Sequence, residues 1–249
     1  MPIKLLDSTL VSLTLSIYDW AHYTATKGAV KMHTLLDYYS LLPEFVNITD
    51  GKTSDNKAAF DIEIHPHSIV VADRGYCDYS LLNHWDSSNV FFVVRHKDNI
   101  RYKSIEELPL PEKHAQNVLV NEIIEFELPT AKSKYPKRLR RIAVWNDEHD
   151  FEVELLTNNF TLAESSIAAL YKARWNIEIF FRNLKQLVRI KSFIGTSRNA
   201  VETQIWTAMT TMLILTWLKH IARYKWALAN LVVTLRLNTF TKIAPKKMA

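Results

Sequence analysis

Short apolar runs separated by polar turns dominate the first hundred residues of the chain. Ile3–Asp7 and Leu10–Ser16 have the pattern of two strands. The compact runs Ser68–Ala72 and Val90–Arg95 are typical of strands that are buried on both faces. The glycine in Asp73-Arg74-Gly75-Tyr76 permits a turn after the first of these runs. We therefore expect a sheet with buried central strands.

A hairpin and a short helix are predicted between these strands. Lys31–Tyr39 and Glu44–Thr49 flank Leu41-Leu42-Pro43, so they form a candidate hairpin. Ser54 is a candidate cap for a short helix that runs through Phe60.

The pattern of apolar and charged residues changes at about residue 98. Val118–Leu128, Leu139–Asn146 and Phe151–Thr157 are predicted strands, joined by Lys-rich or acidic connectors. After residue 160 the pattern is helical. Thr161 and Glu164 have the spacing of a capping box at the start of a helix over Leu162–Gln186.

A second helix is predicted from about Ala200 to Tyr224, and the polar, basic tail after Asn238 is expected to fray. The order of elements predicts an α/β sheet domain that is interrupted before its last helix. We divide the chain into the first part of the core (1–97), a β-rich insertion (98–160), the helices that complete the core (161–226) and a basic tail (227–249).

Composition narrows the class of protein. The chain has 249 residues and is 48% hydrophobic, enough for a sizeable core. The single cysteine, Cys77, excludes an internal disulfide and a cysteine-rich zinc site, which suits the cytoplasm. The first ten residues lack the charged-then-apolar pattern of a secretory leader, so none is expected, and the apolar run Ile205–Leu218 is too short to span a bilayer. A net charge of +5 mildly favours a polyanionic partner.

The candidate chemistry lies in residues 171–185. On a continuous helix Tyr171, Arg174, Glu178 and Lys185 fall within about 60° of one another, with Trp175 and Arg182 at the border of this stripe. The stripe is too long for one small molecule, but it fits a polymer with phosphates along its length. The alternative is a solvated helix face with an Arg–Glu pair four residues apart. Against this alternative, the next 23 residues, 179–201, contain no Asp or Glu but several Arg and Lys.

These residues carry a resemblance to a known family. Tyr171, Arg174, Glu178 and Lys185 match the Y-x2-R-x3-E-x6-K signature of the insertion-sequence-four family of transposases. The family's other blocks resemble, in order, Asp7-Ser8-Thr9, Trp20 with Lys27–Asp37, Asp73-Arg74-Gly75-Tyr76 and the segment SFIGTSRNAVETQIW after the helix. The resemblance extends from Ile3 to about Lys219.

The resemblance implies an RNase H-like fold with a β-strand insertion before the catalytic helix. It also implies that Asp7, Asp73 and Glu178 are catalytic and bind two Mg²⁺ ions, with Mn²⁺ as a substitute. The reaction would be DNA strand cleavage followed by strand transfer at the ends of an insertion sequence. The DNA-binding residues would be Tyr171, Arg174, Trp175, Arg182 and Lys185, with Trp175 stacking on an unpaired base.

The implied partners are transposon ends and target DNA, in the bacterial cytoplasm close to the nucleoid. The resemblance further implies a homodimer on synapsed DNA. Two rival interpretations remain open: a degenerate remnant that binds DNA without cutting it, and a metal-dependent nuclease or resolvase of the same fold.

Several other polar residues are weaker candidates. Asp50 and Asp55 are rival metal ligands, although a turn or helix-cap role is favoured. The segment Lys132–Arg141 is either a solvated connector or a DNA-backbone contact. Four histidines lack the spacing of metal ligands and are interpreted as structural or surface residues: His33, His65, His67 and His96.

Only six residues precede Asp7, whereas family members usually carry an N-terminal domain that recognises the element's ends. The chain is therefore expected to be truncated and to bind DNA without preference for those ends.

Overall fold

The computed structural model describes residues 1–96, 100–110, 117–146, 150–187, 193–221 and 227–238. The chain forms two compact units. The first contains Met1–Leu10 and Val30–Glu178, and the second contains Val11–Ala29 and Ile179–Ala249.

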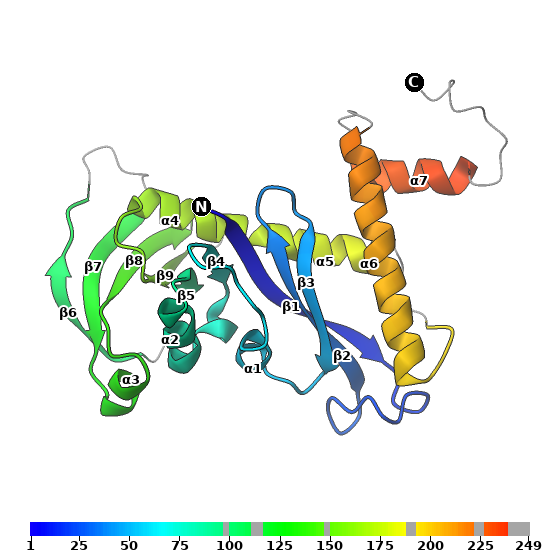
Figure 1. Cartoon of the computed structure of the whole chain (residues 1–249), viewed down its shortest axis with the longest axis horizontal. Helices are drawn as coiled ribbons and strands as arrows, with labels where there is room; N and C mark the ends of the chain where they lie inside the picture. Colours follow the sequence, from blue (N-terminus) through cyan, green and yellow to red (C-terminus); the bar gives the residue numbers. More distant parts are fainter. Residues whose placement is uncertain (97–99, 111–116, 147–149, 188–192, 222–226, 239–249) are drawn as a thin grey trace. The chain divides into compact units, whose positions relative to one another are not determined.

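A nine-stranded mixed sheet forms the framework, in the order β3-β2-β1-β4-β5-β9-β8-β7-β6 (Figure 1). Strand β4 is parallel to both of its neighbours, β1 and β5. From β5 outward, through β9, β8, β7 and β6, every pair is antiparallel. The strands are β1 (Ile3–Leu13), β2 (Gly28–Asp37), β3 (Pro43–Asp50), β4 (Ile69–Ala72), β5 (Phe91–Arg95), β6 (Tyr102–Glu107), β7 (Val118–Phe126), β8 (Leu139–Asn146) and β9 (Phe151–Thr157).

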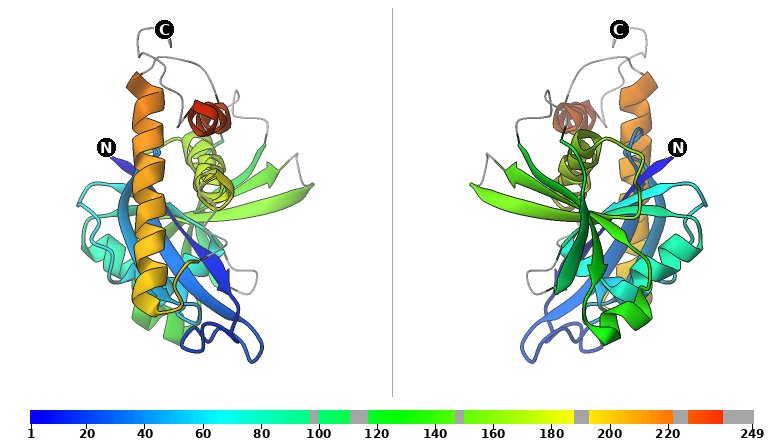
Figure 2. Two further views of the ribbon diagram at one scale, coloured as in Figure 1. Left: turned by 90° about the vertical axis from the view of Figure 1, so that its right-hand side faces the viewer. Right: turned by 90° about the vertical axis from the view of Figure 1, so that its left-hand side faces the viewer.

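Helices cover both faces of the central strands, which explains why these strands are apolar on both sides. One face, with Leu6, Val70 and Phe92, belongs to a core that also contains residues of α1 (Asp55–Ala59), α2 (Tyr79–Ser87) and α3 (Pro129–Lys134). Alternation along the strands turns Leu5, Val71 and Val93 to the other face. There α4 (Glu164–Ala173) contacts β4 and β5, and Figure 2 shows α4 on the opposite side of the sheet from α2 and α3.

The buried strands confirm most of the predicted elements. The runs at Ser68–Ala72 and Val90–Arg95 form β4 and β5, and the predicted hairpin is formed by β2 and β3. The predicted short helix is α1, although the side chain of its N-cap, Ser54, makes no capping bond. One prediction is wrong: Ile3–Asp7 and Leu10–Ser16 are not two strands. A single strand, β1, runs through Ser8 and the β-branched Thr9, which favours extended backbone.

Among the described residues between 98 and 160, four strands continue the same sheet. Strand β9 pairs with β5, with Val93 opposite Thr157, so these strands extend the sheet on that side. The division of the chain at residues 98 and 160 stays a prediction.

The helix predicted over Leu162–Gln186 is interrupted. It forms α4 and α5 (Trp175–Leu187), separated at Arg174. The amides of Arg174 and Ile177 bond to carbonyls three residues back, not four, which tightens the chain at this point. The predicted capping box is absent, because Ala163 is the N-cap of α4. Instead Asn159 Oδ1 accepts from the amides of Thr161 and Leu162.

The second unit contains the rest of α5, α6 (Arg198–Ile221) and α7 (Leu228–Asn238). In it the indole Nε1 of Trp20 donates to the carbonyl of Thr196 at 2.8 Å. The predicted helix from Ala200 corresponds to α6, and the tail beyond Asn238 lies outside the described residues. Within the described part of the chain, no helix is both long and apolar enough to cross a membrane.

Candidate active site

Two aspartates and an arginine lie side by side across the three parallel strands. Leu6 on β1 pairs with Ala72 on β4, and Ala72 pairs with Val94 on β5. The next residues along the three strands are Asp7, Asp73 and Arg95. Parallel strands present their carboxyl ends at one edge of a sheet, which is where ligands bind in open α/β sheets. The sheet register thus brings together two carboxylates that are far apart in sequence.

Backbone amides orient both aspartates. The amide of Ser8 donates to Asp7 Oδ1 at 2.8 Å, and the amide of Gly75 donates to Asp73 Oδ1 at 2.8 Å. Asp73 is also the N-cap of the short 3₁₀ helix η1 (Arg74–Tyr76). A Cβ atom on Gly75 would lie 3.0 Å from Asp73 Oδ1. A larger residue at position 75 would therefore displace the Asp73 carboxylate.

Arg174 links Asp7 to the third carboxylate. Its Nη1 donates to Asp7 Oδ2 at 3.2 Å, and its Nη2 donates to Glu178 Oε1 at 2.7 Å. The guanidinium carbon lies 5.7 Å from the centre of the Tyr171 ring. Tyr171, Arg174 and Glu178 are therefore in consecutive contact, although the continuous helix on which we placed them is interrupted at Arg174.

Burial and like charges make the site electrostatically strained. Burial is the main cause that raises the pKa of Asp7 to about 7, and the nearby Asp73 and Glu178 raise this pKa further. The Ser8 amide and Arg174 act in the opposite direction. Burial also raises the pKa of Tyr171, against the effect of the cations Arg174 and Arg95. A cation bound beside Asp7 would relieve this crowding of carboxylates.

The donor set is chemically suited to a hard cation, because Asp7, Asp73 and Glu178 offer only carboxylate oxygens. The described residues nevertheless contain no group of three or more His, Cys, Asp or Glu side chains arranged to hold a metal ion. Arg174 donates to one oxygen of Asp7 and to one oxygen of Glu178.

The other predicted DNA-binding residues lie on α5. Trp175, at the start of α5, is 49% exposed. Arg182 and Lys185 lie further along α5 and belong to the second unit. Their DNA-binding roles stay predictions.

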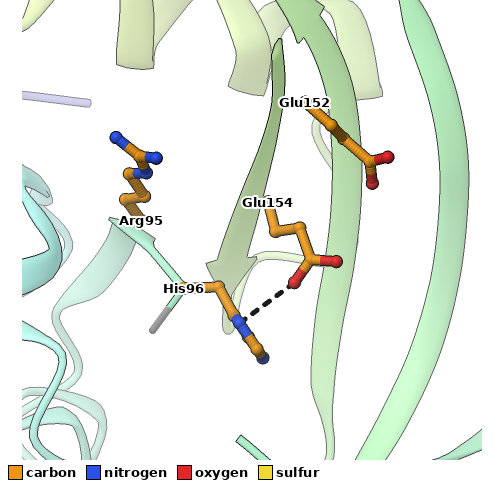
Figure 3. A pocket seen from close by; sticks show the side chains of 4 residues that line it. All are labelled: Arg95, His96, Glu152 and Glu154. Carbon is orange, nitrogen blue, oxygen red and sulfur yellow. Dashed lines mark ion pairs between the residues drawn. The ribbon is translucent and has the colours of Figure 1, made fainter. Parts of the chain in front are cut away.

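The sequence interpretation missed Arg95. Its guanidinium carbon lies 5.2 Å from the centre of the Phe151 ring. Arg95 lines a pocket of about 300 Å³ together with His96, Glu152 and Glu154. Figure 3 shows that its side chain points away from both glutamates, while His96 Nδ1 lies 3.0 Å from Glu154 Oε2. Its sequence signal is one of position and matches no motif: Arg95 follows the apolar residues of β5 as Asp73 follows those of β4.

The basic segment Lys132–Arg141 is largely neutralised by acidic residues. Arg141 is buried and pairs with Glu122 at 2.6 Å and with Glu154. On the surface Lys137 pairs with Asp86 at 2.6 Å, and Arg138 pairs with Glu125 at 2.9 Å. The buried part of this segment is therefore structural.

The weaker candidates also have clear settings. Asp55 follows the N-cap of α1 and bonds to Ser8, while Asp50 is exposed at the end of β3. His33 is fully buried against Thr49, and burial lowers its pKa to about 4. His65 and His67 are exposed.

Comparison with known proteins shows the family of the chain. Residues 1–215 match the family model described as "Transposase DDE domain". The chain therefore belongs to the transposase DDE domain family. A Sinorhizobium fredii protein named as a transposase is 33% identical over 214 residues, which are 86% of this chain and 60% of that protein. A Geobacillus stearothermophilus transposase for an insertion sequence element is 28% identical, over 87% of this chain and 56% of that protein. The chain thus spans somewhat more than half the length of these relatives.

A solved structure has a similar fold. It is the piggyBac transposase in a synaptic complex with hairpin DNA, with a TM-score of 0.55 and 10% sequence identity. The match covers 99% of this chain and 55% of that one. At this level of identity the similarity concerns the fold: a large mixed sheet flanked by helices.

Proposed function

We propose that the chain is the catalytic core of an insertion-sequence transposase that cuts and joins DNA strands. The observation that carries this proposal is the link that Arg174 makes between Asp7 and Glu178, with Asp73 near enough to Asp7 to raise its pKa. The fold is RNase H-like with an inserted group of strands. The contacts among Tyr171, Arg174 and Glu178 support assignment to the insertion-sequence-four family and its Y-R-E-K signature.

Asp7, Asp73 and Glu178 would hold two Mg²⁺ ions, or Mn²⁺ in their place. Such ions activate the attacking oxygen and stabilise the leaving oxygen of an in-line phosphoryl displacement. The Ser8 and Gly75 amides keep one oxygen of each aspartate oriented. Asp7 Oδ2, which accepts from Arg174 in the metal-free chain, and Asp73 Oδ2 would then be the oxygens that bind the ions.

The cations around the carboxylates bind the DNA backbone. Arg174 has a forked guanidinium that suits bidentate phosphate contact, and the Tyr171 hydroxyl adds a hydrogen-bond donor. Arg95, next to Asp73 across the sheet, provides a further phosphate contact. Along α5, Arg182 and Lys185 extend the backbone contacts and the exposed Trp175 stacks on a base.

The partners are the element's ends and target DNA. The similarity to a transposase solved as a synaptic complex with hairpin DNA supports DNA as the substrate. The chain would act as a homodimer on synapsed ends, at the nucleoid of a bacterial cytoplasm.

A cleavage assay tests the proposal. The chain is incubated with a labelled element-end duplex and a target plasmid, in Mg²⁺ or Mn²⁺. We expect strand cleavage and transfer of the labelled 3′ end, and a loss of about a thousandfold or more in Asp7→Asn, Asp73→Asn and Glu178→Gln. Binding without cleavage by the native chain would identify a degenerate remnant. Cleavage without transfer would identify a nuclease or resolvase.

A further inference from the structure

A fourth carboxylate, Asp55, lies behind the two aspartates of the candidate site. It is the first residue of α1, and its side chain is 29% exposed. Its Oδ1 accepts from Ser8 Oγ at 2.5 Å and lies 3.3 Å from Lys31 Nζ. A Cβ atom on Gly75 would lie 3.5 Å from Asp55 Oδ2. Asp55 thus joins α1 to β1 and β2 and lies against the turn that follows β4.

The two residues beside Asp55 are those whose amides orient the aspartates. Ser8 donates its amide to Asp7, and Gly75 donates its amide to Asp73. Asp55 bonds to the side chain of Ser8 and borders Gly75 on the side that carries no side chain. A single carboxylate is therefore in position to fix both amide donors.

Asp55 has a cationic partner of its own. Lys31 supplies the neutralising charge and also donates to the carbonyl of Thr53 at 2.8 Å. His33 Nδ1 lies 3.6 Å away, but burial lowers the pKa of His33 to about 4, so this ring is neutral near pH 7. The hydroxyl of the buried Tyr76 has a pKa raised by burial and then by Asp55, Asp7 and Asp73. All three aspartates therefore act electrostatically on the same buried phenol.

We propose that Asp55 is a positioning residue that holds Ser8 and the Gly75 turn, so that Asp7 and Asp73 face the metal ions in the correct orientation. This inference rests on the proposed function. Asp55 acts through its hydrogen bond to Ser8, and it is not itself a metal ligand. Residues that orient metal ligands in this way typically change metal affinity by about 10–100-fold when they are removed.

The choice of variants separates positioning from ligation. Asp55→Asn keeps an oxygen that accepts from Ser8 Oγ, whereas Asp55→Ala removes the acceptor. A metal ligand would be damaged by both changes, because an amide oxygen is a weaker donor to Mg²⁺ or Mn²⁺ than a carboxylate. Asp61→Ala is the matched control, since Asp61 is an exposed acid just after α1.

The experiment measures Mn²⁺ binding to the DNA-free chain by electron paramagnetic resonance, with folding of every variant checked by circular dichroism. We expect Asp55→Ala and Ser8→Ala each to weaken Mn²⁺ binding by about tenfold, and Asp55→Asn and Asp61→Ala to change it by less than about threefold. The double variant Ser8→Ala/Asp55→Ala should bind no more weakly than either single variant, because both act through one hydrogen bond.

Different failures have different meanings. Asp7→Asn is the reference, and if it binds Mn²⁺ as the native chain does, the proposed metal site itself is wrong. If Asp7→Asn loses binding while Asp55→Ala keeps it, only the positioning role is wrong. Equal losses in Asp55→Asn and Asp55→Ala would make Asp55 a ligand and overturn the proposal. If Asp55→Ala does not fold, the contrast between Asp55→Asn and Ser8→Ala decides in its place.

Discussion

The guanidinium of Arg174 bonds to Asp7, a residue 167 positions earlier in the chain, at 3.2 Å. The same group bonds to Glu178. The side chains of Asp7 and Arg174 are mostly buried, 16% and 15% exposed respectively. Arg174 therefore neutralises two carboxylates in surroundings that screen charge poorly.

Removing this cation should destabilise the fold. In Arg174→Ala, Asp7 and Glu178 lose their shared partner, and we expect the free energy of unfolding to fall by about 1–3 kcal/mol at pH 8 in EDTA. The control is Arg198→Ala, which disrupts the surface pair with Glu202 and should cost less than about 1 kcal/mol. Urea unfolding of both variants is the measurement, and equal losses would mean that the Arg174 contacts contribute no more than a surface pair.

The raised pKa of Asp7 predicts a pH dependence of stability. The folded chain keeps a proton on Asp7 up to about pH 7, whereas the unfolded chain loses it near the ordinary value of 3.8. The native state therefore binds more protons between these values, and stability falls as pH rises through that window. The fall should total about 4 kcal/mol at most, from a pKa difference of about 3 units at 1.36 kcal/mol each, and level off above pH 7.

Urea unfolding from pH 4 to pH 8 in EDTA checks this slope. Asp7→Asn, which cannot titrate, should lack this component of the slope while keeping the contributions of other groups. A native slope that matches that of Asp7→Asn would show that the proton on Asp7 does not affect folding.

The buried ion pairs of the basic segment predict a structural role that the sequence left open. Arg141 is 7% exposed and contacts Glu122 and Glu154. Arg141→Ala leaves these glutamates partly buried without their cation, so we expect a loss of about 3–5 kcal/mol in the free energy of unfolding. Arg138→Ala, at an exposed pair with Glu125, should cost about 0–1 kcal/mol. Thermal melts compare the two variants, and similar shifts in melting temperature would mean that the Arg141 pairs contribute no more than a surface pair.

The sequence predicts elements best where burial imposes a continuous apolar pattern. Strands β4 and β5 are apolar on both faces, so each can be located from its continuous run of apolar residues in the sequence. The break at Arg174 has no such signal, because the helical period is the same on both sides and the break depends on local hydrogen bonding. The carboxylates of the site were found through the resemblance to a family, and their proximity depends on sheet register.

The partners of charged residues were the least predictable feature. In the sequence the segment Lys132–Arg141 looks like an unpaired basic patch. Its acidic partners Glu122 and Glu125 lie elsewhere in the sequence, on the neighbouring strand β7. Cross-strand pairing decides which charges are cancelled, and one sequence does not contain that information. Arg95 was missed for the opposite reason, since a single arginine at the end of a strand matches no motif.

Arg95 provides the sharpest test of the proposed DNA-binding surface. Its guanidinium stacks near Phe151, and among the described residues no carboxylate forms an ion pair with it. It lies beside Asp73 in the sheet register, where a bound phosphate would also lie. In Arg95→Ala we expect weaker DNA binding and a log–log salt slope reduced by about 0.9, the value for one duplex phosphate contact. The effect should be the same for element-end and scrambled duplexes, because phosphate contacts carry no base information.

The control is Arg138→Ala, which removes an arginine that already pairs with Glu125, so the salt slope of this variant should stay at the native value. Fluorescence anisotropy between about 50 and 200 mM salt measures both slopes. An unchanged slope in Arg95→Ala would mean that Arg95 makes no phosphate contact and has a structural role only.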